Sequence, residues 1–480
     1  MAGRRHARRA IRRAIRKGQP DLDLSGLGLV VLPAALAQLT SLQELNLADN
    51  QLTVLPAWFG QLTSLQELNL SGNHLIALPA EFGQLTSLQE LNLAANDLIA
   101  LPAEIGQLAN LQELDLSGCH LTRLPPQIGQ LTSLQELNLS TNPLTELPAE
   151  IGQLTCIEVL YLSPCFLTRL PPQIGQLTSL QELNLADNQL TELPPEIRYL
   201  TNLQELYLAG NQLTELPAEI GRLTNLQVLD LEDNPLAVLP TWFGRLTKLQ
   251  VLLSAGSFSF TGLPAEIGQL ANLQRLDLSE NDLAELPTWI TQLTGLKELR
   301  FRGNGLTRLP AEIGYLANLQ TLDLSDNELA EQLARIMQLT SLQTLYFRRN
   351  GLTRLSAQIG QLANLQTLAL SGNQLTELPA EIGQLANLQA LDLEDNALTV
   401  LPPEVGQLAN LLRLELPRNQ LTVLPAELGQ LTNLQSLDLA GNPLAEPLPG
   451  LAAQGAEAVL AYLQSLAAPA IPPSARTSRE

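Results

Sequence analysis

The sequence predicts an α/β solenoid, with many short parallel strands on a concave face and short helical turns on a convex face. Three observations carry this prediction. A 23-residue spacing of leucines runs through almost the whole 480-residue chain. The segment GQLTSLQELNL occurs four times, at residues 60–70, 83–93, 129–139 and 175–185. Within each period, apolar residues first alternate with polar ones and then recur three residues apart, which is typical of a strand followed by a helical turn.

The order of elements can be followed within one period. In LQELYL the alternation points the leucines inward and Glu205 and Tyr207 outward, as a half-buried strand requires. Pro217 then ends the extended segment. Ile220 and Leu223 follow at the i, i+3 spacing of one short convex turn. One such unit cannot enclose its own leucines, so neighbouring units must stack on it.

The full pattern, LxxLxLxxNxLxxLPxxIGxL, resembles the leucine-rich repeat. The resemblance implies a right-handed, horseshoe-like solenoid. We count eighteen full repeats, from the one that begins at Leu42 to the one at Leu434, plus a partial first unit at residues 21–33. The array therefore predicts about nineteen strands.

Asparagine occupies one fixed position in fifteen of the eighteen repeats, and Cys119, Cys165 and Ser257 replace it in the others. A buried amide both donates and accepts, so we expect it to satisfy loop N–H and C=O groups of its own and the next repeat. These residues are predicted to be structural and not catalytic: Asn50, Asn73, Asn96, Asn142, Asn188, Asn211, Asn234, Asn281, Asn304, Asn327, Asn350, Asn373, Asn396, Asn419 and Asn442.

The two ends depart from the repeat. Residues 1–20 hold arginine pairs around a narrow apolar stripe and predict an amphipathic helix. This helix either caps the first repeat, which we favour, or binds a membrane surface or a nucleic acid. The array spans residues 21–447, residues 448–466 predict a helical cap, and residues 467–480 predict a disordered tail.

Both ends also resemble the leucine-rich-repeat portion of bacterial Roco proteins, in which the array leads into a Ras-like GTPase. That resemblance implies a signalling or scaffold role, with a GTPase on a separate chain as one candidate partner. GTP binding is not carried over, because the sequence contains no GxxxxGK[ST].

Charge and composition narrow the class of protein. Eight of the 27 basic residues precede the first acidic residue, Asp21, so 19 basic residues face 48 acidic ones in the rest of the chain. Such a body is expected to bind no nucleic acid. The sequence holds no apolar run long enough for a membrane span and no secretory signal, which predicts a cytoplasmic location. Cys119, Cys156 and Cys165 are expected to be reduced, and we predict no metal, cofactor or catalytic site.

The outward strand positions are not fixed by the fold, so they are where the sequence can indicate a binding partner. The residue before the second strand leucine is glutamate in seven of the first eight repeats and then varies. This ladder is either a product of recent duplication or selected by a basic partner. Tyrosine, valine and arginine gather where the ladder ends, and tyrosine and arginine dominate interface energetics. The predicted partner-binding residues are Val159, Tyr161, Tyr207, Val228, Leu253, Arg275, Arg300, Arg302, Tyr346, Arg348 and Arg349. The alternative is that Arg348 and Arg349 only pair with Asp326 and with neighbours like Glu280, and that the tyrosines only cover a surface.

The segment VLLSAGSFSFTGLP, residues 251–264, breaks the repeat at this place. If Phe260 takes the place of the leucine after the asparagine position, Ser254 replaces a strand leucine. Placing Leu253 inward instead would exchange the two faces. The sequence as a whole predicts a non-enzymatic scaffold that binds a protein partner on the concave face, with a regulatory arm of a GTPase system and membrane attachment through the first helix as alternatives.

Overall fold

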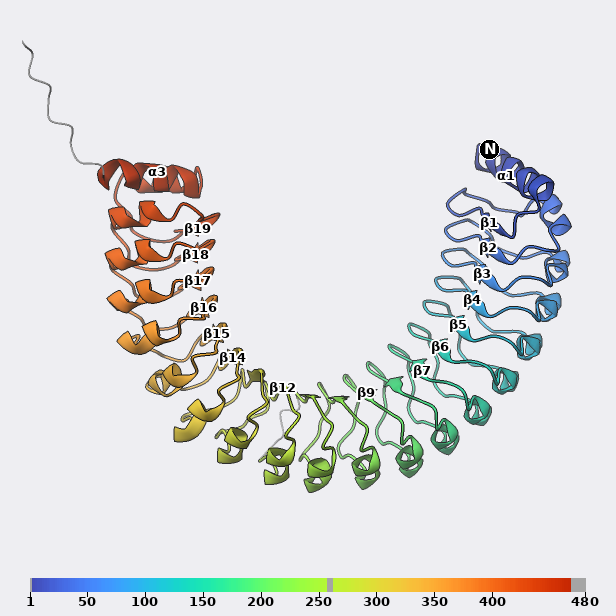
Figure 1. The fold of residues 1–480 in the computed structure, drawn as a ribbon, viewed down its shortest axis with the longest axis horizontal. Helices are drawn as coiled ribbons and strands as arrows, with labels where there is room; N and C mark the ends of the chain where they lie inside the picture. Colours follow the sequence, from blue (N-terminus) through green and yellow to red (C-terminus); the bar gives the residue numbers. More distant parts are fainter. Residues whose placement is uncertain (1, 257–261, 468–480) are drawn as a thin grey trace, which may run out of the picture. The chain divides into compact units, whose positions relative to one another are not determined.

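A computed structural model describes residues 2–256 and 262–467 of the chain (Figure 1). They fall into two compact units, residues 2–256 and residues 262–467. None of the helices in these residues is long and apolar enough to cross a membrane.

The first unit holds one α-helix, α1 (Ala2–Lys17), followed by a parallel sheet in which each strand pairs with the next along the chain. Its strands are β1 (Asp21–Asp23), β2 (Glu44–Asn46), β3 (Glu67–Asn69), β4 (Glu90–Asn92), β5 (Glu113–Asp115), β6 (Glu136–Asn138), β7 (Val159–Tyr161), β8 (Glu182–Asn184), β9 (Glu205–Tyr207), β10 (Val228–Asp230) and β11 (Val251–Leu253). The 3-10 turns between them are η1 (Ala34–Gln38), η2 (Ala57–Gln61), η3 (Ala80–Gln84), η4 (Ala103–Gln107), η5 (Pro126–Gln130), η6 (Ala149–Gln153), η7 (Pro172–Gln176), η8 (Pro195–Tyr199), η9 (Ala218–Arg222) and η10 (Thr241–Arg245).

The second unit repeats the same arrangement and ends in two α-helices, α2 (Leu448–Ala452) and α3 (Ala456–Ala467). Its strands are β12 (Arg275–Asp277), β13 (Glu298–Arg300), β14 (Thr321–Asp323), β15 (Thr344–Tyr346), β16 (Thr367–Ala369), β17 (Ala390–Asp392), β18 (Arg413–Glu415) and β19 (Ser436–Asp438). Its 3-10 turns are η11 (Ala265–Gln269), η12 (Thr288–Gln292), η13 (Ala311–Tyr315), η14 (Leu333–Gln338), η15 (Ala357–Gln361), η16 (Ala380–Gln384), η17 (Pro403–Gln407) and η18 (Ala426–Gln430).

Within each unit the strands lie on the inner side of the curve and the 3-10 turns lie on the outer side (Figure 1). The predicted solenoid and its nineteen short strands are therefore confirmed. In β9, Leu206 and the following Leu208 are fully buried, while Glu205 and Tyr207 face outward and are half-buried. Parallel strands lie about 4.8 Å apart and bulkier turns fill the other side, so the stack has to curve.

The asparagine ladder holds the loops together. Oδ1 of Asn142 accepts a hydrogen bond from the Leu121 N–H at 3.0 Å. Its Nδ2 donates to the carbonyls of Leu116 and Leu139 at 2.8 and 2.9 Å. Asn142 therefore has the predicted structural role. The prediction that it also bonds the next repeat is wrong, because the other loop that it bonds belongs to the preceding repeat. The loop carrying the asparagine lies beside the loop of the previous strand, so its amide meets groups that came earlier in the chain.

Cysteine fills this position in two repeats, and each thiol makes one weaker bond. Sγ of Cys119 donates to the Leu93 carbonyl at 3.4 Å, and Sγ of Cys165 donates to the Leu139 carbonyl at 3.5 Å. Burial raises the pKa of both thiols. Together with exposed Cys156 they are free cysteines, as predicted. Ser257, the third exception, lies outside the described residues.

The helices α1 and α3 pack on the first and last repeats of their units. Ala7, Ile11 and Ala14 of α1 are buried against β1 and η1, and all of its arginines are exposed. At the other end, Val459 and Leu463 of α3 are buried against η18. The predicted tail, residues 467–480, lies outside the described residues except for the backbone of its first residue.

Replacing Ile11 with aspartate is expected to detach α1, because Ile11 is fully buried and a carboxylate cannot stay there unpaired. The leucines of the first repeat would then be exposed. We expect lower solubility and rapid proteolysis at residues 1–20. Ile15→Asp is the matched control, because Ile15 is 38% exposed; equal protease resistance of both variants would contradict the packing role of the helix.

Candidate functional site

The predicted residues of the first unit lie where the alternation placed them. Val159 and Tyr161 are on β7, Tyr207 is on β9 and Val228 is on β10, and all four are half-buried and face outward. They form an apolar and aromatic area on the inner side of this unit. We call these four residues and Leu253 the aromatic cluster.

The register of β11 decides the place of Leu253. Leu252 and Ser254 are fully buried, whereas Leu253 faces outward and is half-buried. Leu253 pairs with Asp230 of β10, which has the same orientation. The first of the two predicted registers is therefore confirmed, and Ser254 replaces a strand leucine. Phe260, which the prediction set at the place of the leucine after the asparagine position, lies outside the described residues.

The two tyrosines lie among glutamates. Oη of Tyr207 donates to Oε2 of Glu205 at 2.5 Å. Burial and the carboxylates of Glu182 and Glu205 raise the pKa of both phenols, so Tyr161 and Tyr207 stay neutral donors. Each ring therefore presents an apolar face with a fixed polar tip, which suits contact with a peptide.

The predicted residues of the second unit form ion pairs. Arg300, on β13, lies 2.6 Å from Glu298 of the same strand and 3.9 Å from Asp277 of β12. Arg275, also on β12, lies 3.6 Å from Glu298. The arginine side chains remain 37% and 39% exposed, so the pairs hold the guanidinium groups in place at the surface and do not bury them.

The other three arginines follow β13 and β15. Arg302 lies 2.9 Å and Arg349 lies 3.2 Å from the carboxylate of Asp326, and Arg302 lies 3.8 Å from Glu280. Arg348 pairs with Asp392 at 3.2 Å, and its guanidinium carbon lies 5.2 Å from the centre of the Tyr346 ring. These pairs border a shallow groove of about 350 Å³. We call the predicted arginines with Tyr346 the arginine cluster.

The alternative prediction named Asp326 as a partner of Arg348 and Arg349, and Arg349 does pair with it, but Asp392 and Arg418 were missed. Asp326 and Asp392 each bind a predicted arginine, and Arg418 lines the same groove and pairs with Glu394. Arg302 and Asp326 are separated by 24 residues, as are Arg418 and Glu394. A search for opposite charges about one repeat apart would have found these two pairs, but not the pair of Arg348 and Asp392. Exposed ion pairs contribute little stability, so the pairing does not exclude partner binding.

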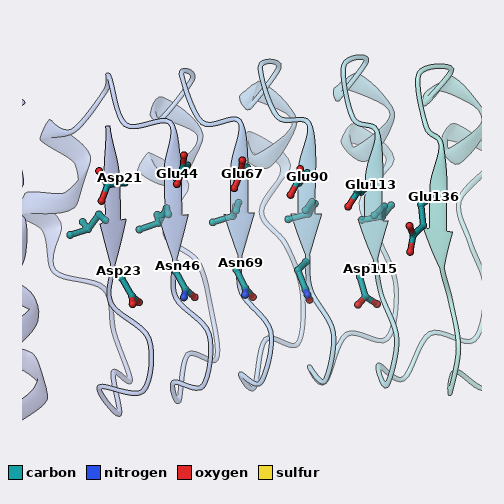
Figure 2. Close-up of a pocket in the computed structure, with 16 residues that line it drawn as sticks. Asp21, Asp23, Glu44, Asn46, Glu67, Asn69, Glu90, Glu113, Asp115 and Glu136 are labelled. Carbon is teal, nitrogen blue, oxygen red and sulfur yellow. The ribbon is translucent and has the colours of Figure 1, made fainter. Parts of the chain in front are cut away.

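A second feature of the first unit is a row of carboxylates on the inner side of β1–β6, which Figure 2 shows. Asp21, Glu44, Glu67, Glu90, Glu113 and Glu136 occupy successive paired positions on these strands. They line a groove of about 500 Å³. We call these six residues the acidic stripe. Burial, and next the neighbouring carboxylates, raise the pKa of Glu90 and of Glu136.

The stripe predicts a pH dependence of stability. A carboxyl group whose pKa is raised in the folded state binds more protons there than in the unfolded chain, so stability falls as pH rises through the interval just above the ordinary pKa of 4.5. Glu90→Gln is expected to flatten this dependence and to raise the melting temperature at neutral pH. Thermal melts across the interval measure it, with Glu81→Gln on η3 as the control. A variant that melts like the wild type at every pH would contradict the prediction.

No group of three or more histidine, cysteine, aspartate or glutamate side chains suited to a metal ion occurs within residues 2–256 and 262–467. The stripe is open and its members have similar surroundings. It does not separate an acid from a base as a catalytic carboxylate pair does.

Family models of leucine-rich repeats match most of the array. A model described as a leucine-rich repeat region matches residues 91–165, 291–371 and 356–443. Another, described as leucine rich repeat, matches residues 21–75, 157–213, 178–236 and 201–255. No curated protein sequence matches the chain.

Solved structures of similar proteins extend over nearly the same length. A leucine-rich-repeat protein from Leptospira interrogans is 39% identical, with 92% of this chain and 95% of that one covered and a TM-score of 0.56. YopM from Yersinia enterocolitica is 29% identical over 92% of each chain, with a TM-score of 0.67. The plant peptide hormone receptor RGFR1 in complex with RGF2 is 31% identical, with 88% of this chain and 78% of that one covered and a TM-score of 0.66.

Proposed function

This chain belongs to the leucine-rich repeat proteins, and from that premise we propose that it is a non-enzymatic scaffold that binds a protein partner on the inner faces of its strands. The observation that supports this most is that the inward and outward positions of each strand differ in what determines their residues. Inward positions are leucines that the fold requires, whereas outward positions change from glutamate to tyrosine, valine and arginine. The similarity to a receptor that was solved with a peptide hormone supports the same kind of role.

We assign the partner contacts to the aromatic cluster in the first unit and to the arginine cluster in the second. Tyr161 and Tyr207 offer wide, half-buried rings whose hydroxyl groups are oriented by glutamates. The arginines are held by carboxylates but are 37–71% exposed, so their remaining N–H groups stay available. Preorganised aromatic and arginine side chains lose little entropy when a partner binds. Each cluster by itself fits an extended polypeptide segment.

Reversing four charges, with Arg300→Glu, Arg302→Glu, Arg348→Glu and Arg349→Glu, is expected to abolish capture of the partner from an extract of the native cell. The thermal melt is expected to change by only a few degrees, because the four arginine side chains are 39–71% exposed. Affinity capture followed by mass spectrometry measures the first effect.

The matched control reverses the charge of four arginines that each lie four residues after the asparagine position of their repeat. They are Arg123, Arg169, Arg308 and Arg354. This variant has the same net charge, and its substitutions lie away from the strand faces. Capture that survives the first variant, or that is lost equally in both, would contradict the proposed site.

A narrower form of the proposal makes the partner a GTPase on a separate chain, in a cytoplasmic signalling complex. The resemblance of both ends to the repeat portion of Roco proteins supports the partner class, and the three free cysteines support a reducing compartment. Mass spectrometry of the captured partner decides this form directly. A captured protein without a nucleotide-binding domain would exclude it and leave the broader proposal intact.

A further inference from the structure

The first unit carries two surfaces of strong and opposite charge that its own contacts leave unpaired. One is the exposed side of α1, with Arg4, Arg5, Arg8, Arg9, Arg12, Arg13, Arg16 and Lys17. Within residues 2–256 and 262–467, none of these cations forms an ion pair with a carboxylate. They are separate from both clusters assigned above.

The other surface is the acidic stripe. Among the described residues, no basic side chain forms an ion pair with any of its six carboxylates or lines its groove. In the arginine cluster of the second unit, by contrast, each arginine lies within 4 Å of a carboxylate. Burial, and next the repulsion of the neighbouring glutamates, raise the pKa of Glu90.

The two surfaces also match in length. A helix rises about 1.5 Å per residue, so the 16 residues of α1 extend about 24 Å. Six strands at intervals of about 4.8 Å likewise extend about 24 Å. Arg5, Arg9, Arg12 and Arg16 recur every three or four residues on one side of the helix, which spaces them by about 4.5–6 Å along its axis. This spacing lies close to the interval between successive carboxylates of the stripe.

We propose that the basic side of α1 docks into the acidic stripe of a second copy of this chain. The helix is fixed on its own first repeat through Ala7, Ile11 and Ala14, and its arginines lie exposed and available to the second molecule. Helix and stripe belong to neighbouring elements of the same unit. Two copies can therefore exchange both contacts in a two-fold symmetric pair, in which each helix lies in the other's stripe.

A second copy fits this helix better than a membrane does. Peripheral membrane helices insert large apolar residues into the lipid, but the apolar residues of α1 are mostly alanine and its only fully buried isoleucine is used in packing. The proposed contact is ionic. It should therefore form at low ionic strength and weaken steeply as salt is added.

A charge exchange tests the proposal. The stripe variant carries Glu67→Lys, Glu90→Lys and Glu113→Lys, and the helix variant carries Arg5→Glu, Arg9→Glu, Arg12→Glu and Arg16→Glu. Sedimentation at low ionic strength is expected to show dimers of the wild type and monomers of each variant alone, with association weakened more than about tenfold. An equimolar mixture of the two variants is expected to form a one-to-one dimer. The arginine helix of the stripe variant meets an unchanged acidic stripe, and the glutamate helix of the helix variant meets the lysine stripe with the charges exchanged.

The matched control carries Glu81→Lys, Glu104→Lys and Glu150→Lys on η3, η4 and η6, which gives the same net charge as the stripe variant. It should dimerise like the wild type. Dimers in the mixture also show that both variants are folded. A wild type that is monomeric at all salt concentrations, or a mixture that stays monomeric while both variants melt normally, would overturn the proposal. So would binding of the monomeric wild type to vesicles of anionic lipid, which would assign the helix to a membrane surface.

Discussion

Replacing Asn142 with alanine is expected to destabilise the first unit by about 3 kcal/mol, because it removes three buried hydrogen bonds at once. The Leu121 N–H and the carbonyls of Leu116 and Leu139 would lose their partner. Asn142 is 3% exposed, so water cannot replace the amide without opening the loop. A lower urea midpoint and faster amide exchange around Leu121 measure the effect.

Cys119→Asn is the reverse experiment at the same position of another repeat. An amide there can donate to the Leu93 carbonyl, to which the thiol now donates at 3.4 Å, and can add the bonds that other ladder asparagines make. We expect a gain of about 1 kcal/mol. An Asn142→Ala variant that unfolds like the wild type, together with no gain from Cys119→Asn, would show that the ladder bonds are replaceable.

Replacing Gly106 with valine is expected to lower the free energy of unfolding of the first unit by about 2–3 kcal/mol, because it disturbs the packing of the 3-10 turns on the outer side. A β-carbon at Gly106 would lie 2.7 Å from the carbonyl oxygen of Gln127 and would also collide with Oε1 of Gln130, both on the next turn. The Gln130 side chain can move, but the backbone carbonyl can move only if η4 and η5 separate. Denaturation midpoints measure the loss.

Gly305→Val is the matched control, because a β-carbon at Gly305 meets no atom within 4 Å and its backbone is not left-handed. This variant should unfold close to the wild type. Similar losses in both variants would mean that valine acts through the unfolded chain, and not through the spacing of the turns.

The fold could be predicted because its information is periodic and local. The alternation in LQELYL predicts which side of β9 is buried, and Leu206 and Tyr207 lie as expected. The direction of the Asn142 hydrogen bonds could not be predicted in the same way. It depends on which neighbouring loop lies beside the amide, and that is a property of the stacked coil and not of one repeat.

The candidate site could be predicted only in part. The outward positions of Tyr161 and Arg300 follow from the strand pattern, and the structure bears them out. The pairing of Arg348 with Asp392, 44 residues later, does not follow, because a long side chain can reach across more than one neighbour. Whether these residues bind a partner depends on a molecule that the sequence does not describe.

The ladder makes the solenoid directional. Each asparagine serves its own loop and the one before it, so the loop of any repeat is completed by the repeat that follows. Removing coils from the amino-terminal side would leave side-chain amides without backbone partners, which water can solvate. Removing them from the carboxyl-terminal side would leave backbone N–H and C=O groups of the last loop without their side-chain partners. The two ends of such an array are therefore chemically different although its repeats are alike.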